Sequence, residues 1–406
     1  MLKPQQTLVN DSQVCSHVLL QSNHAIERTG YRVQQPGLTI AQEFRQQIAA
    51  AADQIDAQRR LPDPLVAALK RAHVFRCLIP ESLGGLALTL PDFLDMVQEL
   101  AEADASTAWC VTQGAVIATL SVWLAPEIAK EIWQDPDAAT ANGPPLNCLA
   151  TPDGDDYRLT GRWGFSSGCQ HANWMLGAAR VAGSKGWVMS FFPKEEATFH
   201  DNWQVQGLRG TGSFEFSVQD LVVIKSCTAD MSLPPNHEDD LYKIPSGLTF
   251  AVSFASVALG VARAGLDVVL ALANDKVPGF TSQVLKDDPL VHTQVGQAEI
   301  RWRAARAFLH ATVAEIWNAL PNQSGITEDQ RIALRMAGTH VIREAAAALD
   351  IGYTVAGSSG IYHDNPLHRR FQDMHVITQH VQGRPGHYGF VGKYLLGHPY
   401  QHGPLN

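Results

Sequence analysis

The middle of the chain alternates short strand-like runs with turn signals, and this pattern constrains the fold more than any other feature. The runs at 174–181, 187–192 and 214–224 are rich in β-branched and aromatic residues, and glycine-containing turns such as 182–186 separate them. Strands that return after so few residues leave no room for helical crossovers between them. The pattern therefore predicts an antiparallel β domain.

Helical patterns flank this β region on both sides. Upstream, Phe44, Ile48 and Ile55 recur at helical spacing, and Pro91 suits the first turn of a further helix. Downstream, long helical patterns with alanine-rich faces suit a closely packed bundle; they cover 248–273, 289–320, 329–356 and 368–380. We expect a mostly α fold around a central, barrel-like antiparallel β domain. Its parts are an N-terminal extension at 1–37, a helical domain at 38–137, the β domain at 138–235 and a four-helix bundle at 236–406.

The charge balance and the cysteines limit the partners and the compartment. A formal net charge of −9 without a lysine- or arginine-rich block argues against nucleic-acid binding, because phosphate contacts need a basic face. Six scattered cysteines without a C-x-x-C pair, and an N-terminus without a continuous apolar stretch, indicate a cytoplasmic protein. The most apolar segment, 248–273, contains Arg263 and Asp267, so we expect a buried core helix there and no membrane span.

Several motifs, in chain order, resemble those of proteins with the acyl-CoA dehydrogenase fold. Leu-Pro-Asp-Pro-Leu-Val at 61–66 and the stretch ending in Ser-Leu-Gly-Gly at 75–85 are similar to the opening of that fold. Gly-Arg-Trp-Gly-Phe-Ser-Ser-Gly at 161–168, Gly-Leu-Arg-Gly-Thr-Gly-Ser at 207–213 and Arg-Arg-Phe-Gln-Asp-Met-His-Val-Ile-Thr-Gln-His at 369–380 resemble one branch of it. That branch is the oxygenase components of two-component flavin-dependent monooxygenases (group D), such as the p-hydroxyphenylacetate and 3-hydroxy-seco-steroid hydroxylases. The resemblance extends from about residue 38 onward.

This resemblance implies an oxygenase that takes reduced FMN or FAD and O2, forms a C4a-hydroperoxyflavin and hydroxylates a small aromatic or heteroaromatic molecule. A separate NAD(P)H:flavin reductase would supply the electrons, since the chain shows no nicotinamide-binding βαβ unit. The resemblance also implies a homotetramer, because the flavin site of this fold is completed between subunits. At 274–280 the chain lacks the Arg and Phe-Gly with which the dehydrogenases hold the adenosine of FAD, which suits a borrowed flavin.

In the family, the motif at 161–168 faces the flavin. The hydroxyl partner of flavin N5 corresponds to Ser166, and a neutral hydroxyl in a dry pocket is suited to protecting the hydroperoxide. The alternative is that Ser166 and Ser167 only satisfy backbone groups of a tight turn. The glycine-rich motif at 207–213 either contributes flavin contacts or is simply a turn before the next strand. The resulting candidate flavin contacts are Trp163, Phe165, Ser166, Ser167, Arg209, Thr211 and Ser213.

Two histidines near the C-terminus are candidates for catalysis and substrate binding. The family motif places His380 beside flavin and substrate as the catalytic proton-transfer residue, and histidine suits removing a phenol proton or managing the leaving hydroxyl. On one helix over 368–380, His375 and His380 would lie about 140° apart, so we expect no shared face and no metal site. His375 is a candidate substrate contact, with a core histidine as the alternative.

Further candidate substrate contacts are Trp109, Gln113 and Asn142, although a helical tryptophan is more often part of the core. Asp373, in the same motif as Arg369 and Arg370, is expected to form a surface or interdomain salt bridge.

The main alternative is an acyl-CoA dehydrogenase or a nitroalkane-type oxidase, and a non-catalytic scaffold is a second one. Dehydrogenation needs a carboxylate base, which these enzymes carry near the C-terminus or on the first helix of the bundle. No Asp or Glu follows Asp373, and none occurs in 246–264, so the base would have to be relocated.

Overall fold

The computed structural model describes residues 35–403, so nearly all of the expected N-terminal extension lies outside the described residues. The described chain begins with helices that carry clear start signals. Thr89 caps one of them by accepting a hydrogen bond from Asp92 N, and Asp104 caps the next by accepting from Thr107 N. As expected, this region is helical; it contains α2 (Pro36–Gln58), α3 (Asp63–Arg71), α4 (Leu90–Ala103), α5 (Ala105–Ala118) and α6 (Pro126–Gln134).

The central region is a single eight-stranded sheet with the order β6-β7-β3-β2-β4-β5-β8, to which β1 is added by pairing with β4. The expected runs at 174–181, 187–192 and 214–224 all form strands. The strands are β1 (Thr140–Asn142), β2 (Pro145–Asp153), β3 (Asp156–Ser166), β4 (Trp174–Val181), β5 (Trp187–Pro193), β6 (Thr198–His200), β7 (Phe214–Val223) and β8 (Thr228–Ala229).

The sheet is mostly antiparallel, as expected, but it is mixed at one strand. Strand β4 runs parallel to both β1 and β2, while the other pairings are antiparallel. The cause is the path of the chain. A hairpin joins β2 to β3, so β3 ends beside the start of β2; residues 167–173 then cross that end and begin β4 on the other side of β2. The connection from β2 to β4 thus contains a strand where parallel neighbours usually have a helix.

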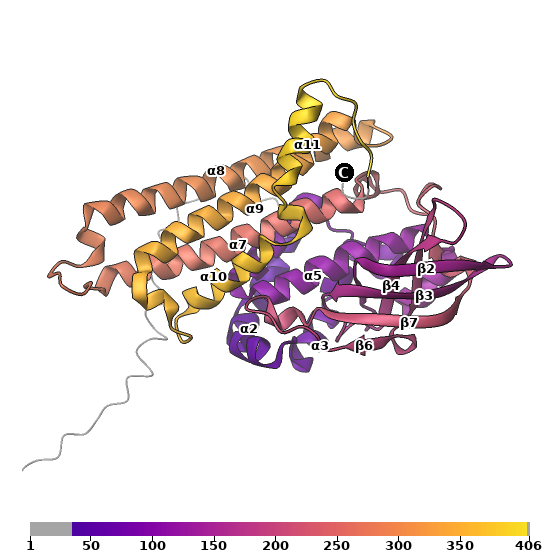
Figure 1. The fold of residues 1–406 in the computed structure, drawn as a ribbon, viewed down its shortest axis with the longest axis horizontal. Helices are drawn as coiled ribbons and strands as arrows, with labels where there is room; N and C mark the ends of the chain where they lie inside the picture. Colours follow the sequence, from indigo (N-terminus) through magenta and orange to yellow (C-terminus); the bar gives the residue numbers. More distant parts are fainter. Residues whose placement is uncertain (1–34, 404–406) are drawn as a thin grey trace, which may run out of the picture. The chain divides into compact units, whose positions relative to one another are not determined.

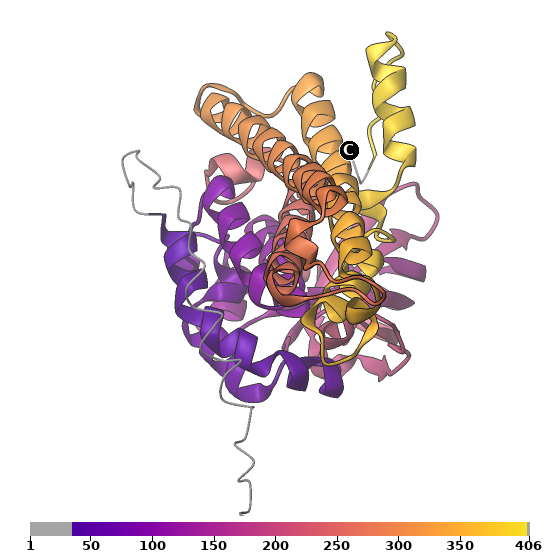
Figure 2. The same cartoon turned by 90° about the vertical axis from the view of Figure 1, so that its left-hand side faces the viewer.

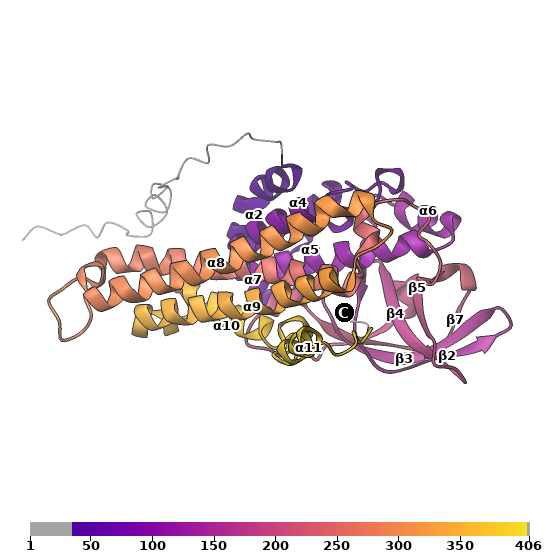
Figure 3. The ribbon, with the colours of Figure 1, turned by 90° about the horizontal axis from the view of Figure 1, so that it is seen from above.

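The C-terminal region is a bundle of long helices. α7 (Ser246–Asp275), α8 (Pro289–Ala319), α9 (Glu328–Ala356) and α10 (Pro366–Ile377) run side by side, and the short α11 (Gly386–Leu395) follows (Figures 1 and 3). A capping box of Thr327 and Gln330 begins α9. The bundle was expected, but its fourth helix ends at Ile377 and not at residue 380.

The N-terminal helices and the bundle share one hydrophobic core, which includes buried side chains of α2, α4, α5, α7 and α9. Looking along the bundle, Figure 2 shows the N-terminal helices on one side and α11 on the other. Two stretches, Ala105–Trp123 and Ser246–Asp275, are long and apolar enough to cross a membrane, but most of each is buried inside the protein. Burial of this kind is typical of core helices, and α7 packs against α4, α9 and α10.

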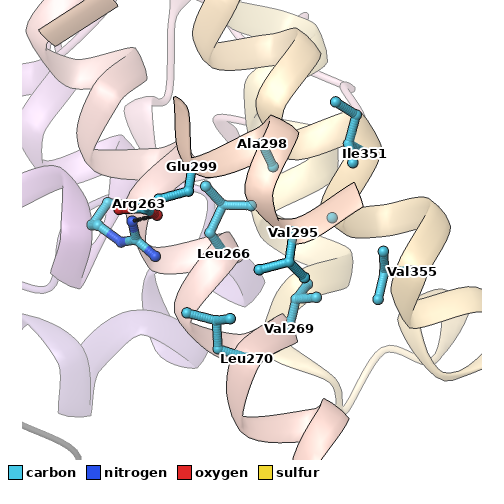
Figure 4. A pocket seen from close by; sticks show the side chains of 10 residues that line it. Arg263, Leu266, Val269, Leu270, Val295, Ala298, Glu299, Ile351 and Val355 are labelled. Carbon is cyan, nitrogen blue, oxygen red and sulfur yellow. Dashed lines mark hydrogen bonds and ion pairs between the residues drawn. The ribbon is translucent and has the colours of Figure 1, made fainter. Parts of the chain in front are cut away.

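A pocket between α7, α8 and α9 is too small for a substrate. Leu266, Val269 and Val295 line it, with Arg263 and Glu299 paired at one end (Figure 4). Its internal space is about 10 Å³, roughly enough for a single water molecule.

Gly260 sets the distance between α4 and α7, which gives a test of the shared core. A Cβ at this position would lie 2.2 Å from the backbone oxygen of Gln98, so we expect Gly260→Ala to lower the free energy of unfolding by about 1–3 kcal/mol. Gly296→Ala on α8 is the matched control. Nothing lies within 4 Å of its added Cβ, so a gain of about 0.4–1 kcal/mol is expected. Thermal unfolding of both variants checks this, and equal melting temperatures would contradict the close contact.

Candidate functional site

Strand β3 ends in an irregular turn that separates the side chains of Phe165 and Ser166. The pairing of β3 with β7 shifts register between Trp163 and Ser166, and Phe165 has a φ of +54°, which strains a residue other than glycine. The Phe165 side chain is 63% exposed and meets the ring of Trp203 edge-on at 6.1 Å between centroids. Ser166 is fully buried. The turn therefore presents an apolar ring outward and a hydroxyl inward.

A chain of hydrogen bonds runs from α5 through this turn into the glycine-rich loop. Trp109 Nε1 donates to Ser167 Oγ at 3.2 Å, Ser167 Oγ lies 2.7 Å from Ser213 Oγ, and Ser213 Oγ lies 2.6 Å from Thr211 Oγ1. Thr211 ends the chain by donating to the carbonyl oxygen of Leu208 at 2.8 Å. Each hydroxyl has one hydrogen, so Thr211 accepts from Ser213, and Ser213 accepts from Ser167. All three hydroxyl hydrogens are therefore committed within the protein.

The hydroxyl of Ser166 is outside this chain. Its Oγ makes no geometrically acceptable hydrogen bond with another described residue, although it lies close enough to the Cys169 thiol to interact with it. Burial raises the pKa of that thiol to about 12, and Ser166 is one of the groups that oppose the rise. Ser190 and Ser253 also carry buried hydroxyls that have no hydrogen-bond partner within residues 35–403. What distinguishes Ser166 is its place in a strained turn beside the exposed ring of Phe165.

Trp109 belongs to a group of aromatic rings that includes His380. Phe254 of α7 stacks on Trp109 with centroids 3.8 Å apart, and Phe250 stacks on Phe254 at 5.5 Å. The His380 ring meets Trp109 edge-on at 5.1 Å and Phe254 at 4.9 Å. Because Trp109 also donates to Ser167, the structure brings His380 and the β3 turn to the same side of α5.

His380 lies beyond the end of α10, so the expectation that it shares one helix with His375 is wrong. The backbone oxygen of Thr378 accepts from Arg343 on α9, and His380 begins the 3-10 turn η12 (Val381–Gly383). Nδ1 of His380 accepts a long hydrogen bond, 3.4 Å, from Gln382 N. A ring nitrogen that accepts carries no hydrogen, so the neutral ring has its hydrogen on Nε2.

The His380 ring is neutral at pH 7. Although the residue keeps some exposed surface, it is densely surrounded, and this burial lowers the pKa of His380 to about 4. Trp109 and Phe254, the rings that face it, carry no charge.

Gln113 and Asn142 meet each other beside Trp109. Gln113 is one turn along α5 from Trp109, and its Nε2 donates to Oδ1 of Asn142 at the end of β1. Both residues are half-buried. Trp109 and Gln113 thus lie on one face of α5, and Asn142 meets Gln113 from β1.

Trp163 lies away from this group. Its ring is fully buried inside the β domain, where it stacks on Phe216 at 5.0 Å and donates from Nε1 to the backbone oxygen of Ala178. The ring has no surface left for a cofactor, so its position favours a core role over the expected flavin contact.

His375 and Arg209 are also held elsewhere. His375 Nε2 lies 3.0 Å from Oδ1 of Asp350 on α9, at the surface of the bundle. Arg209 donates to the backbone oxygens of Asp56 and Val205. These contacts favour structural roles for both residues over the expected substrate contact of His375 and flavin contact of Arg209.

Asp373 connects the glycine-rich loop to α10. It is buried, and its Oδ1 accepts a hydrogen bond from Leu208 N at 2.6 Å. The neighbouring Arg370 instead donates to the backbone oxygens of residues 101–103. The expected salt bridge of Asp373 is therefore replaced, among the described residues, by a backbone hydrogen bond. Burial raises the pKa of Asp373 to about 7, and the bond from Leu208 opposes the rise.

Comparison with known proteins agrees with this architecture. Family models for the N-terminal and C-terminal domains of acyl-CoA dehydrogenases match residues 38–133 and 252–385. The fold is similar to that of XiaF from Streptomyces sp. in complex with FADH2 and glycerol, with a TM-score of 0.83 at 21% identity over 91% of this chain and 96% of that one. The chain is 25% identical to the oxygenase component of p-hydroxyphenylacetate 3-hydroxylase from Acinetobacter baumannii, over 85% of this chain and 86% of that protein. It is also 31% identical to indole-3-acetate monooxygenase from Pseudomonas putida, over 81% of this chain and 85% of that protein.

The chain belongs to the flavin-dependent monooxygenase oxygenase components of the acyl-CoA dehydrogenase fold. The expectations for the family and for this fold are confirmed.

Sequence reasoning missed several residues of the candidate site. Phe254 and Phe250 were part of an apolar helical pattern and could not be told from ordinary core residues, although their spacing of four places both on one face. Trp203 lies in a loop without a motif, and Gln382 follows the family motif by two residues. Between residues 35 and 403, no group of three or more His, Cys, Asp or Glu side chains is arranged to hold a metal ion.

The raised pKa of Asp373 predicts how Asp373→Asn changes the stability of the oxygenase. The folded pKa of about 7 lies above the ordinary 3.8, so ionisation destabilises the folded state progressively as pH rises from about 4 to 7. Asparagine keeps an acceptor for Leu208 N and has no such titration. We expect the stability of Asp373→Asn relative to the unchanged protein to be more favourable at pH 8 than at pH 5, by on the order of 1–3 kcal/mol.

Thermal unfolding at both pH values measures this, with Asp53→Asn, which changes a fully exposed carboxylate, as the control. A difference that does not vary with pH would contradict the buried, titrating carboxyl.

Proposed function

We propose that this oxygenase uses reduced flavin and O2 to hydroxylate a small aromatic or heteroaromatic compound at the group formed by Ser166, Trp109 and His380. The observation that carries the proposal is the buried hydroxyl of Ser166, which makes no hydrogen bond of acceptable geometry with another described residue, while the hydroxyl hydrogens of Ser167, Ser213 and Thr211 are committed. The two relatives named for aromatic substrates, indole-3-acetate and p-hydroxyphenylacetate, support the substrate class.

The β3 turn has the features that a flavin ring requires. Phe165 offers exposed aromatic surface, and Ser166 offers a hydroxyl that makes no hydrogen bond of acceptable geometry with another described residue. Reduced flavin held there would supply two electrons and the ring position at which O2 is activated. Ser166 would hold it at N5, while Ser167, Ser213 and Thr211 fix the turn and can offer a ligand only their lone pairs.

His380 acts in this proposal as a hydrogen-bond donor through Nε2. Its Nδ1 is engaged with Gln382 N, and its pKa of about 4 leaves it neutral at the pH of the cytoplasm, where we expect the enzyme to work. A neutral donor suits stabilising the leaving hydroxyl better than removing a phenol proton, since Nε2 already carries a hydrogen. This favours one of the two roles expected from the sequence.

The substrate would lie against a wall formed by Trp109, which Phe254 backs from the other side, with the amides of Gln113 and Asn142 at the polar end. Such a wall suits a flat ring. A separate NAD(P)H:flavin reductase would supply the reduced flavin, and we expect the flavin site to be completed in a homotetramer. The dehydrogenase alternative is not favoured, because the chain has no acidic residue after Asp373 or in 246–264.

The decisive measurement is stopped-flow absorbance after anaerobic mixing of the protein with reduced FMN or FAD and then with oxygenated buffer. A species that absorbs in the near ultraviolet should precede oxidised flavin. Ser166→Ala should shorten its lifetime by about tenfold or more, because the loss of one hydrogen bond is worth about 1.4 kcal/mol or more in a dry site.

Ser190→Ala removes an equally buried hydroxyl from β5, which also has no hydrogen-bond partner in the described part of the chain. It is the matched control and should leave the lifetime unchanged. Flavin oxidation by the unchanged protein at the rate of free reduced flavin, without the early species, would overturn the proposed function.

Two replacements of His380 distinguish a role as hydrogen-bond donor from a role as proton acceptor. Glutamine can place an N–H near the position of Nε2 but cannot take a proton, whereas alanine does neither. We expect His380→Gln to keep hydroxylation of indole-3-acetate or p-hydroxyphenylacetate within about tenfold, and His380→Ala to lose about 100-fold. Product formed per flavin oxidised, measured from pH 6 to 8, checks this. Equal losses in the two variants would assign His380 to proton acceptance instead.

A further inference from the structure

The segment that carries His380 has little regular structure of its own. Between the end of α10 at Ile377 and the start of α11 at Gly386, residues 378–383 contain only the short turn η12. We call 378–383 the His380 segment. Its conformation must be set by other elements, because a 3-10 turn of three residues is not stable alone.

Helix α9 supplies that support through three polar side chains at four-residue intervals. Arg343 Nε donates to Gly383 O at 2.7 Å and Nη2 donates to Thr378 O at 2.9 Å, so one guanidinium holds both ends of the His380 segment. Thr339 Oγ1 donates to the backbone oxygen of Gln382 at 3.1 Å. Arg335 Nη1 donates to the side-chain oxygen of Gln382. Residues spaced by four lie on one face of a helix, so this face of α9 is a clamp for the segment.

Gln382 transmits this hold to His380. Its side chain is fixed at both ends, by Arg335 and by Gly247 O, to which its Nε2 donates at 3.1 Å. Its backbone N donates to Nδ1 of His380. A backbone N–H can only donate, so the position of Gln382 decides which nitrogen of His380 carries the hydrogen.

Burying the guanidinium of Arg335 costs free energy, so a role in general packing does not explain why it is there. Arg335 is fully buried, and among the described residues it forms no salt bridge with a carboxylate and its Nε has no hydrogen-bond partner. Its hydrogen bonds go instead to the side-chain oxygen of Gln382 and to the backbone oxygen of Gly247. A buried guanidinium without a counter-charge adds little net stability, but a planar fork of donors fixes divergent acceptors in one geometry.

We propose that Arg335 and Arg343 are positioning residues, which hold the His380 segment on α9 and thereby keep the His380 ring against Trp109 and Phe254 with its hydrogen on Nε2. The importance of this for catalysis rests on the proposed role of His380. The hold itself concerns only residues of this chain and can be measured without flavin.

The test uses Trp109 as a reporter, because a protonated imidazole beside an indole quenches its fluorescence. The groups around His380 are the uncharged rings of Trp109 and Phe254 and, behind its segment, Arg335 and Arg343; burial alone lowers the pKa of the ring. In the flavin-free protein we expect no quenching step between pH 5.5 and 8. In Arg343→Met the released ring becomes hydrated, so the pKa of His380 should rise from about 4 by about two units, toward its ordinary value of 6.5, and a quenching step should appear in this range. The step should be absent when Trp109→Phe is added.

Arg343→Lys separates geometry from charge. Lysine keeps the charge but cannot donate to both Gly383 O and Thr378 O in the arginine geometry. The pKa of His380 in Arg343→Lys should therefore lie between its values in the unchanged protein and in Arg343→Met. Arg301→Met is the matched control, since Arg301 ties α8 to Glu344 of α9 and does not contact the His380 segment. Should Arg343→Met fail to fold, Thr339→Val removes one hydrogen bond to the segment at nearly constant volume and should give a smaller step of the same sign.

Folded Arg343→Met, Arg343→Lys and Thr339→Val that all titrate like the unchanged protein would overturn the clamp. Hydroxylation separates the two proposals. A quenching step together with a loss of product per flavin oxidised, at unchanged affinity for reduced flavin, supports both of them. A quenching step with unchanged hydroxylation supports the clamp and overturns the catalytic role of His380.

Discussion

The hydrogen bond from Leu208 N to the buried carboxyl of Asp373 holds the two halves of the site together. On one side it fixes the start of the glycine-rich loop, and the loop fixes the β3 turn through Thr211, Ser213 and Ser167. On the other side it fixes α10, from whose end the chain continues to His380. Because each hydroxyl has a single hydrogen, the direction of every bond from Trp109 to Leu208 follows from the carbonyl at the far end.

The site is assembled from all three regions of the chain. Trp109 comes from an N-terminal helix, Ser166 from the sheet, and Phe254 and His380 from the bundle. The N-terminal helices and the bundle share one core, so the distances between these residues depend on close helix contacts such as that of Gly260 with Gln98. A change in that core would therefore move groups that are far apart in the sequence.

The order of helices, strands and bundle was readable from the sequence because hydrophobic period and turn signals are local properties. The parallel placement of β4 was not, because it depends on which side of β2 the segment 167–173 crosses. The motifs located Ser166 and His380, whereas the end of α10 and the tautomer of His380 depend on Arg343 and Gln382, which are contacts across elements. For the same reason Trp163 was expected at the cofactor, although only the packing of Phe216 shows that its ring is enclosed.

Phe165 combines a φ of +54° with a side chain that is 63% exposed, so the protein holds a large apolar group in water at a strained position. Such an arrangement costs about 1–3 kcal/mol in backbone strain, and covering the ring recovers hydrophobic free energy. A cofactor or another chain that covers the ring would therefore be stabilised by that contact before any reaction takes place, independently of turnover.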